Sequence, residues 1–432
     1  MTAQTCRDER GAATLVVVMV LFLIMAMMAA YASRNVIFEQ RIASSYYRAG
    51  VSLEAAEAGA EWTLGMLNGL KIDQACLASN SATDRFRDRY LTISSTSRDI
   101  LPAAIVSTPG TATRKIVADC VRTEAQEGWA CNCPTGTWSA AAAPASAGNM
   151  QPSFKVSLIS PVANRAGNLR IESAGCTSSI AQNCDADAMS SDMALARSVV
   201  QLDAALLSAL KVPPATALTV KGSINLGTNG IGLHNSEAIS NGLLLLTSDD
   251  AVPNLLETRL DSLPGTPVQQ GLIFADPVLA SASPEQMFKM FFGMSLKRYV
   301  NQPAMRQVTC SGDCGPALAA AYAKGTRLAW VRGSLDILSA TVLGSATSPM
   351  LIIAEGPVRI DAGLELTGLL YARGNTIWTN SSGQPALLKG AMLVDGDLTV
   401  DGTVDIWYQT SVMDELKNRA GSFVRVQGSW WN

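Results

Sequence analysis

The sequence predicts an α+β fold in which a long N-terminal transmembrane helix packs on a small antiparallel sheet, followed by a β-rich, β-solenoid-like domain. Three observations support this prediction. An unbroken apolar run covers residues 12–32, strand-like alternation fills the middle of the chain, and glycine-led apolar strands recur in its C-terminal half. The 432 residues leave room for two or three domains beyond the apolar run.

Composition and charge exclude several classes of function. Charged residues make up 16% of the chain, the net charge is −3, and no basic patch alternates with aromatic residues. A nucleic-acid partner is therefore not expected. A hydrophobic content of 48% argues against extensive disorder.

The apolar run, Ala12 to Ala32, follows a polar leader of residues 1–11 that ends in Arg10-Gly11. About 20 apolar residues at 1.5 Å each span a bilayer core of about 30 Å, so residues 12–33 are predicted to cross a membrane. A secretory signal has a shorter apolar core and a small-residue cleavage site after it, which this chain lacks.

The same helix is predicted to continue to about residue 68, because no proline precedes Pro102 and Gly69 is a natural stop. Its second half carries one apolar stripe at helical spacing. The stripe consists of Leu53, Ala56, Ala60, Leu64 and Leu67. Arg34, Arg41 and Arg48 recur every seven residues on another face. They either contact solvent and lipid headgroups or pair with acidic residues of neighbouring subunits in a fibre.

The membrane orientation rests on conflicting signals. Arg7 and Arg10 precede the apolar run, whereas three arginines follow it, and counting basic residues alone favours the opposite orientation. The bulky, cysteine-rich remainder lies after the anchor, which favours an N-in, C-out orientation for a single-pass protein.

Residues 69–211 are predicted to form a compact α+β head. Residues 154–159, 168–172 and 198–202 alternate as half-buried strands do, and an antiparallel sheet of these strands would cover the apolar stripe. Residues 140–148 form a low-complexity loop, and Pro213-Pro214 marks the boundary to the next domain.

Residues 215–432 are predicted to form the β-solenoid-like domain. A glycine followed by alternating apolar residues recurs, and from Gly333 onward the period is 18 to 23 residues, which suits one coil. The copies begin at Gly222, Gly333, Gly356 and Gly396. An insert at residues 249–325 breaks the period and carries a helical stretch near residues 284–299, and Trp430-Trp431 is expected to cap or dock.

Nine cysteines are present, of which Cys6 lies in the leader. The even number of cysteines beyond the anchor predicts disulfides in an oxidising compartment. These disulfide candidates are Cys76, Cys120, Cys131, Cys133, Cys176, Cys184, Cys310 and Cys314. Local pairs are expected for Cys176–Cys184 and Cys310–Cys314. Cys131 and Cys133 are too close in sequence to pair with each other, so each is expected to reach Cys76 or Cys120. A zinc site at Cys120, Cys131 and Cys133 is the alternative, but it lacks CxxC spacing and a nearby histidine.

Catalytic chemistry is not expected, and no catalytic residue is assigned. His234 is the only histidine and lies in a glycine-rich turn, and no G-x-S-x-G motif is present. Asp395, Asp397, Asp401 and Asp405 form a carboxylate cluster of the kind that β-solenoid glycosidases use. Aspartates beside turn glycines more often stabilise the turn, and that interpretation is favoured.

Cofactors and metals are not expected either. Asp185, Asp187 and Asp192 are candidate calcium ligands, but the spacing lacks the glycine and the terminal glutamate of an EF-hand loop. The glycine-rich stretch 226–232 lacks the Lys-Ser/Thr pair of a phosphate-binding loop.

Residues 7–62 resemble the PilX family of type IV pilus minor pilins. The resemblance rests on the Arg-Gly-Ala junction, the all-apolar start, residues 38–43 (FEQRIA) and residues 53–58 (LEAAEA). Residues 129–134 (WACNCP) and Gly175-Cys176 resemble pilin-head features less specifically. The C-terminal half is longer than in a typical PilX protein and is covered only loosely.

The resemblance implies cleavage after Gly11 by prepilin peptidase and methylation of the new amino terminus at Ala12. The fifth mature residue is then Val16, where major pilins usually have glutamate. PilX-like and K-type pseudopilins share this departure. A buried glutamate inside a bilayer needs a partner, such as the amino terminus of the preceding subunit. A subunit without it has no such need, which would suit the first subunit at a fibre tip.

The expected function is that of a non-enzymatic minor pilin in type IV pilus initiation, with adhesion or twitching motility as downstream effects. Its expected partners are other minor pilins, the major pilin, a tip adhesin, prepilin peptidase and the inner membrane. Three alternatives are a K-type minor pseudopilin of a type II secretion system, a membrane-tethered β-solenoid enzyme that acts on polysaccharide through Asp395 and Asp397, and an envelope protein with an adhesive solenoid that retains its leader.

Overall fold

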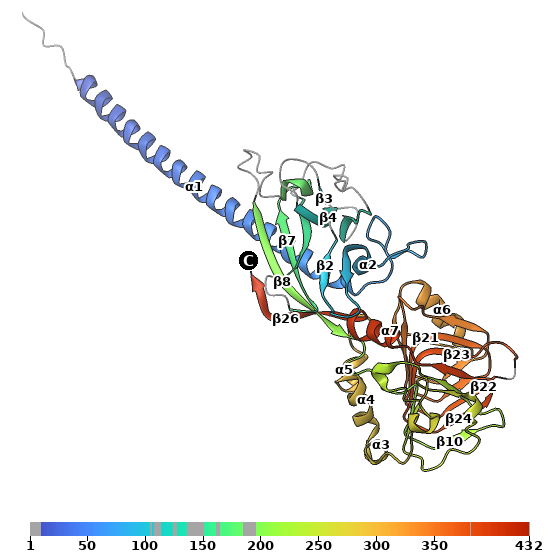
Figure 1. Ribbon diagram of the computed structural model, residues 1–432. Coiled ribbons are helices and arrows are strands. Elements are labelled where there is room, and N and C mark those ends of the chain that lie inside the picture. The colour runs from blue at the N-terminus through green and yellow to red at the C-terminus, as the bar shows by residue number, and fades with distance from the viewer. Residues whose placement is uncertain are drawn as a thin grey trace, which may run out of the picture.

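The computed structural model describes residues 10–103, 106–107, 114–123, 128–135, 151–160, 165–184, 196–380 and 382–431. A long helix projects from a sheet, and a second β-rich part lies beyond the far end of that helix (Figure 1). The predicted α+β layout, with a long N-terminal helix and a β-rich remainder, is correct. The predicted loop at 140–148 and the candidate calcium ligands Asp185, Asp187 and Asp192 lie outside the described residues.

Helix α1 runs from Arg10 to Leu67, close to the predicted bounds. Its end is closed by the amides of Asn68 and Gly69, which donate to the carbonyls of Gly65 and Met66 at 3.1 and 3.0 Å. The Asn68 side chain also donates to the Leu64 carbonyl at 2.9 Å. These bonds satisfy carbonyl groups that a helix end otherwise leaves unpaired.

An antiparallel sheet of seven strands packs against the second half of α1. Its strands are β3 (Val106–Ser107), β4 (Arg114–Thr123), β5 (Gly128–Asn132), β6 (Ser153–Ile159), β7 (Asn168–Cys176), β8 (Arg197–Ser208) and β26 (Gly421–Trp431). The order is β26-β8-β7-β6-β4-β3, and β5 pairs with β4. The three strands expected from alternation are β6, β7 and β8 at its centre.

Alternation decides which face of this sheet is buried. Strand β8 buries every second residue, and Leu202, Ala204 and Leu206 lie in the core under α1. The apolar stripe of α1 covers that core, with Ala56, Ala60 and Leu67 fully buried. A short hairpin, β1 (Leu91–Ile93) and β2 (Ile100–Pro102), follows helix α2 (Phe86–Tyr90) beside it.

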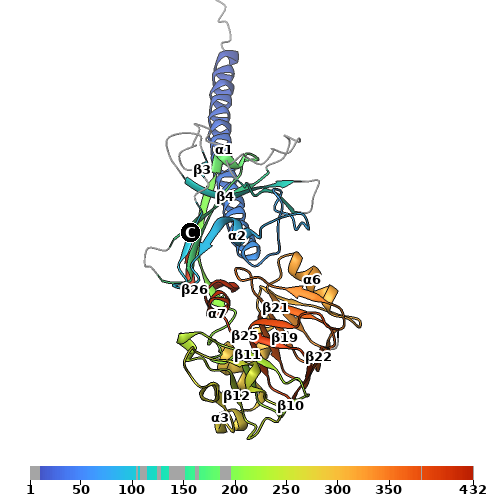
Figure 2. The same ribbon diagram turned by 45° about the vertical axis from the view of Figure 1, so that its right-hand side comes forward.

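Residues 218–407, called the parallel-strand region below, contain two sheets whose strands pair in parallel (Figure 2). One has five strands: β10 (Ile224–Leu226), β17 (Leu335–Ile337), β20 (Val358–Ile360), β22 (Thr376–Asn380) and β24 (Leu398–Gly402). The other has twelve strands. They are β9 (Leu218–Val220), β11 (Gly232–His234), β12 (Leu245–Thr247), β13 (Leu260–Asp261), β14 (Leu272–Ile273), β15 (Met305–Gln307), β16 (Leu328–Val331), β18 (Thr341–Leu343), β19 (Met350–Ala354), β21 (Leu364–Ala372), β23 (Leu387–Val394) and β25 (Asp405–Trp407).

Neighbouring strands are separated by the same numbers of residues in the two sheets. In the five-stranded sheet Leu335 lies opposite Val358, Val358 opposite Thr376, and Thr376 opposite Leu398, which are steps of 23, 18 and 22 residues. In the other sheet the same steps separate β16, β19, β21 and β23. The residues between the sheets form one apolar core of Leu, Ile, Val and aromatic side chains.

The chain does not fill this region in sequence order. Its first strands, β9, β10 and β11, pair with the last ones, β23, β24 and β25. Of the strands that follow, β12 pairs with β9, β13 with β11 and β14 with β12, which extends the sheet at one end. Strand β15 pairs with β16 at the other end. The predicted insert therefore supplies strands β13, β14 and β15 to the sheet, which the broken period had hidden.

Helices inside the insert carry the chain between the two ends of the stack. They are α3 (Pro277–Ser281), α4 (Pro284–Phe292) and α5 (Leu296–Tyr299), and α6 (Gly315–Ala323) follows β15. Helix α4 starts with a capping box at Ser283 and ends at Gly293, whose φ is 72°. Phe288 and Phe292 pack edge-on against Tyr371 of β21.

The C-terminal domain boundary differs from the prediction. After helix α7 (Thr410–Asp414) and a π-helical turn (Glu415–Arg419), strand β26 returns to the antiparallel sheet and pairs with β8. Residues 421–431 therefore belong to the sheet around α1 and not to the second part. The reason is that β8 needs a partner on that side, and the alternating run that starts at Gly421 provides one.

Candidate functional site

The first half of α1 is an uncovered apolar rod. Phe22 is 70% exposed, Met27 is 65% exposed and Val16 is 59% exposed. No charged residue lies between Arg10 and Arg34, and α1 is the one helix among the described residues that is long and apolar enough to cross a membrane. None of its most apolar window is buried by the rest of the chain. Such a surface needs a lipid or protein environment.

The predicted cleavage junction lies at the start of this rod. Helix α1 begins at Arg10, so Gly11 and Ala12 lie in its first turn, and residues 1–9 lie outside the described part of the chain. Val16 follows one turn later and exposes an apolar side chain where a carboxylate would require a partner. Cleavage after Gly11 remains a prediction.

The second half of α1 is held to the sheet by close backbone contact. A Cβ atom on Gly175 of β7 would lie 2.3 Å from both the Ala56 nitrogen and the Ser52 carbonyl oxygen. A Cβ atom on Gly59 would lie 2.2 Å from the Ser173 hydroxyl. Only glycine permits this approach. The hydroxyls of Ser52 and Ser198 hydrogen-bond at 2.8 Å beside it.

Strand β26 completes this attachment. The buried Asn68 amide donates to the Phe423 carbonyl at 2.9 Å, and the Phe423 amide donates back to Asn68 at 2.8 Å. Glu61 of α1 forms an ion pair with Arg425 of β26. The second half of α1 is therefore attached to both β7 and β26 of the sheet.

The arginines of the seven-residue repeat lie above this base. Arg34 and Arg41 are exposed, whereas Arg48, close to the sheet, is partly buried. The exposure of Arg34 and Arg41 allows either of the two predicted interpretations, contact with headgroups or pairing with a neighbouring subunit.

All eight cysteines beyond the anchor are paired in the structure. The disulfides are Cys76–Cys133, Cys120–Cys131, Cys176–Cys184 and Cys310–Cys314. Three lie in or beside the antiparallel sheet, and the fourth closes the loop before α6. The zinc alternative fails because Cys120, Cys131 and Cys133 have no free thiolate, and among the described residues no group of three His, Cys, Asp or Glu could hold a metal ion.

The carboxylates near residue 400 are engaged in structural contacts. Asp397 accepts hydrogen bonds from the Ser223 amide and hydroxyl, both at 2.9 Å, and Asp401 accepts from the Gly402 amide at 3.0 Å. Asp395 is buried and pairs with Lys221 at 3.3 Å. These contacts agree with the turn interpretation, because Asp395 and Asp397 bind the segment at residues 221–223 and Asp401 binds its own backbone neighbour.

His234 is held in a separate cluster. Its ring stacks on Trp407 with centroids 4.2 Å apart, and its Nε2 lies 3.4 Å from Asp405. Arg259 also donates to Asp405, at 2.9 Å. Hydrogen bonds from His234 and Arg259 keep the pKa of the Asp405 carboxyl below its usual range. The described cluster contains no hydroxyl or thiol nucleophile beside the histidine, so a triad arrangement is absent there.

The fold and the rod together define a membrane-anchored protein whose N-terminal helix is half uncovered and half packed on a sheet. Residues 10–61 match the PilX N-terminal family model. This segment is a PilX-type pilin N-terminal domain, as its junction and its LEAAEA block predicted. No curated protein and no solved structure matches the chain.

Sequence reasoning missed two parts of this site. The close approach of α1 and the sheet at Gly59 and Gly175 was not predicted. A glycine within an otherwise strong helix or strand is a signal of such close backbone approach. Strand β26 was assigned to the wrong domain, although its alternation from Gly421 to Val426 was visible.

Proposed function

We propose that this chain is a minor pilin that takes part in type IV pilus assembly, within the complex that initiates the fibre and stays at its tip. Pilus-dependent adhesion or motility would follow from that role, and the chain would act as a structural subunit rather than an enzyme. The observation that carries the proposal is the uncovered apolar rod of α1 within a PilX-type domain.

The rod explains how one helix serves two environments. In the membrane its side chains contact lipid, and in a fibre they contact the helices of other pilins, which are similarly apolar. Transfer between these environments changes little hydrophobic free energy. The absence of charge from Gly11 to Ser33 removes any need for a partner on the way.

Prepilin peptidase would cut after Gly11, and Ala12 would carry the methylated amino terminus. Before assembly the chain would lie in the inner membrane with its N-terminus inside, and the four disulfides would form on the oxidising side. After assembly it would be exposed on the pilus or cell surface.

The parallel-strand region would be a β-solenoid-like domain. The matched steps of 23, 18 and 22 residues in both sheets support that interpretation. Figures 1 and 2 both show this region beyond the end of α1 that carries the sheet. Another pilin stacked beyond that end would meet it, which supports a position at the tip, next to other minor pilins and a tip adhesin.

Gold labelling of an epitope inserted after Gly265 tests the tip position. Gly265 lies in an exposed turn, and a Cβ atom there meets nothing within 4 Å, so the tag should not disturb folding. We expect label at one end of each pilus and fewer pili in a deletion strain, restored by the tagged chain. Label along the whole shaft, or a normal number of pili without the gene, would contradict the proposal.

A further inference from the structure

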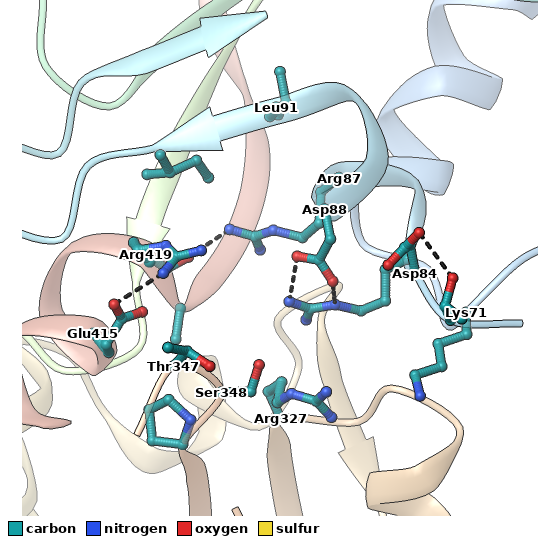
Figure 3. Close-up of a pocket in the computed structure, with 15 residues that line it drawn as sticks. Lys71, Asp84, Arg87, Asp88, Leu91, Arg327, Thr347, Ser348, Glu415 and Arg419 are labelled. Carbon is teal, nitrogen blue, oxygen red and sulfur yellow. Dashed lines mark hydrogen bonds and ion pairs between the residues drawn. The ribbon is translucent and has the colours of Figure 1, made fainter. Parts of the chain in front are cut away.

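A polar cavity of about 280 Å³ lies where the antiparallel sheet meets the parallel-strand region. Its lining comes from residues 71–93, from residues 327–349 and from the turn at 415–420 (Figure 3). The first and third segments flank the antiparallel sheet, and the second belongs to the parallel-strand region. The cavity therefore depends on the docking of both parts.

The lining carries more positive than negative charge. Its cations are Lys71, Arg85, Arg87, Arg327 and Arg419, and its carboxylates are Asp84, Asp88 and Glu415. Arg85 binds Asp88 through two hydrogen bonds of 2.7 and 2.9 Å, and Arg419 pairs with Glu415 at 2.9 Å. Among the residues that the structure describes, neither Lys71 nor Arg327 has a carboxylate within ion-pair distance.

Arg87 serves a structural purpose and is not available to a ligand. Its guanidinium is buried and donates to the carbonyls of Gly421 and Arg419 at 2.8 and 2.5 Å. Burial lowers its pKa to about 9, so it remains cationic at neutral pH. Lys71 and Arg327 are therefore the lining cations that no carboxylate pairs with among the described residues. Asp84, which accepts a hydrogen bond from the Thr83 hydroxyl at 2.9 Å, is the lining carboxylate without a cation partner there.

A glycine turn brings these two cations to one side of the cavity. The Lys71 amide donates to the Lys324 carbonyl at 2.9 Å, and Lys71 forms an isolated antiparallel bridge with Arg85. Gly325 has a φ of 105°, and a Cβ atom there would lie 3.1 Å from both the Lys71 nitrogen and the Arg85 Cγ. Arg327 follows two residues later.

The Arg327 guanidinium is fixed but not neutralised. Its Nη1 donates to the carbonyls of Tyr322 and Thr326, both at 3.0 Å, and it stacks over the Tyr322 ring at 4.2 Å. Its buried Nε has no hydrogen-bond partner. Burial and the nearby Arg85 guanidinium lower the pKa of Arg327. A bound anion would offset the repulsion between the Arg85 and Arg327 guanidinium groups.

We propose that this cavity binds a phosphate group between Lys71 and Arg327. Five cations and three carboxylates give the lining a net charge of +2, which matches the charge of about −1.5 to −2 that a phosphate monoester carries at pH 7. The cavity is several times the roughly 30 Å³ share of one water molecule, so it leaves room for the molecule that carries the phosphate. The hydroxyl of Ser348, which also lines the cavity, would contact that molecule or the phosphate itself.

Calorimetric titration of the full-length chain in a non-ionic detergent tests this proposal, with inorganic phosphate and glycerol phosphate as probes. Acetate at equal ionic strength is the reference for non-specific screening. We expect both phosphates to bind saturably and more tightly than acetate. Tighter binding of glycerol phosphate would indicate an esterified ligand, and equal binding would indicate that the phosphate group alone is recognised.

Variants assign the binding to the cavity. Lys71→Met should weaken phosphate binding about tenfold or more, and Lys71→Glu should abolish it. Lys324→Met removes the same charge from an exposed neighbour outside the cavity and should bind as the wild type does. Unchanged melting temperatures of the free variants establish that they fold. Absence of saturable binding to both phosphates, or equal binding by Lys71→Met and the wild type, would overturn the proposal.

Discussion

Gly59 and Gly65 both lie inside α1, but only Gly59 faces the sheet. A Cβ atom at Gly59 would meet Ser173 and Phe154 at 2.2 and 2.7 Å, whereas one at Gly65 would meet nothing within 4 Å. We predict that Gly59→Ala destabilises the protein by about 1–3 kcal/mol, because the helix must move away from the sheet. Urea denaturation of the full chain in detergent measures this effect.

Gly65→Ala is the matched control in the same helix. Because the site is exposed and helical, alanine should stabilise the protein there by about 0.5–1 kcal/mol. A similar change in stability for both variants would contradict the close contact between α1 and the sheet.

Asp405 makes the stability of the parallel-strand region depend on pH. The folded-state pKa of the Asp405 carboxyl lies below 3.8, the ordinary value for an aspartate, chiefly because His234 donates a hydrogen bond to it. A carboxyl with a lowered folded-state pKa stabilises the fold above its unfolded pKa, and this contribution is lost as the pH falls through the folded pKa. We therefore predict that the melting temperature of Asp405→Asn falls less than that of the wild type when the pH is lowered from 6 into the acidic range. A series of melting curves measures this difference.

The control for this series is Asp401→Asn, because the Asp401 carboxylate accepts a hydrogen bond from Gly402 and forms no ion pair among the described residues. It should follow the wild-type pH profile. The same acid sensitivity in Asp405→Asn and the wild type would show that the contact with His234 and Arg259 contributes nothing to stability.

At the scale of the elements, the disulfides differ in the length of chain that they close. Cys76–Cys133 spans 57 residues, whereas Cys176–Cys184 spans 8. Loop-closure entropy predicts a loss of about 4 kcal/mol when the first is removed and about 2.5 kcal/mol for the second. Paired Cys→Ser variants and chemical denaturation compare the two, and an equal or reversed ranking would show that native contacts rather than loop length determine the effect.

The elements also show which signals a sequence carries. Strands β6, β7 and β8 were predictable because apolar and polar residues alternate over at least five positions in each sequence, although β6 is buried on both faces at its start. Helix α4 was predictable from its Ser-Pro start and its aromatic face. Strands β13 and β14 were not, because they are only two residues long and their pairing partners lie elsewhere in the chain.

At the scale of the whole molecule, the order of the stack could not be predicted from the periodic glycines. Their spacing gives the length of one step, but it does not state that the first strands pair with the last ones. That pairing depends on the helices α3–α5, which carry the chain from one end of the stack to the other. The cavity was equally hidden, because Lys71 and Arg327 are 256 positions apart in the sequence.

The anchor, in contrast, was predictable as a unit. Residues 10–61 combine a charge-free apolar run, a junction glycine and the LEAAEA block within one continuous helix, so local sequence determines it. The proposal that the chain enters the pilin pathway depends on this helix.

Mass spectrometry of the mature N-terminus, in cells with and without prepilin peptidase, tests that claim most directly. We predict a chain that begins with methylated Ala12 only in cells that have the peptidase, and an uncut chain in cells that lack it. An intact Met1, or the same cut at another position in both strains, would contradict the pilin account and favour a tethered envelope protein.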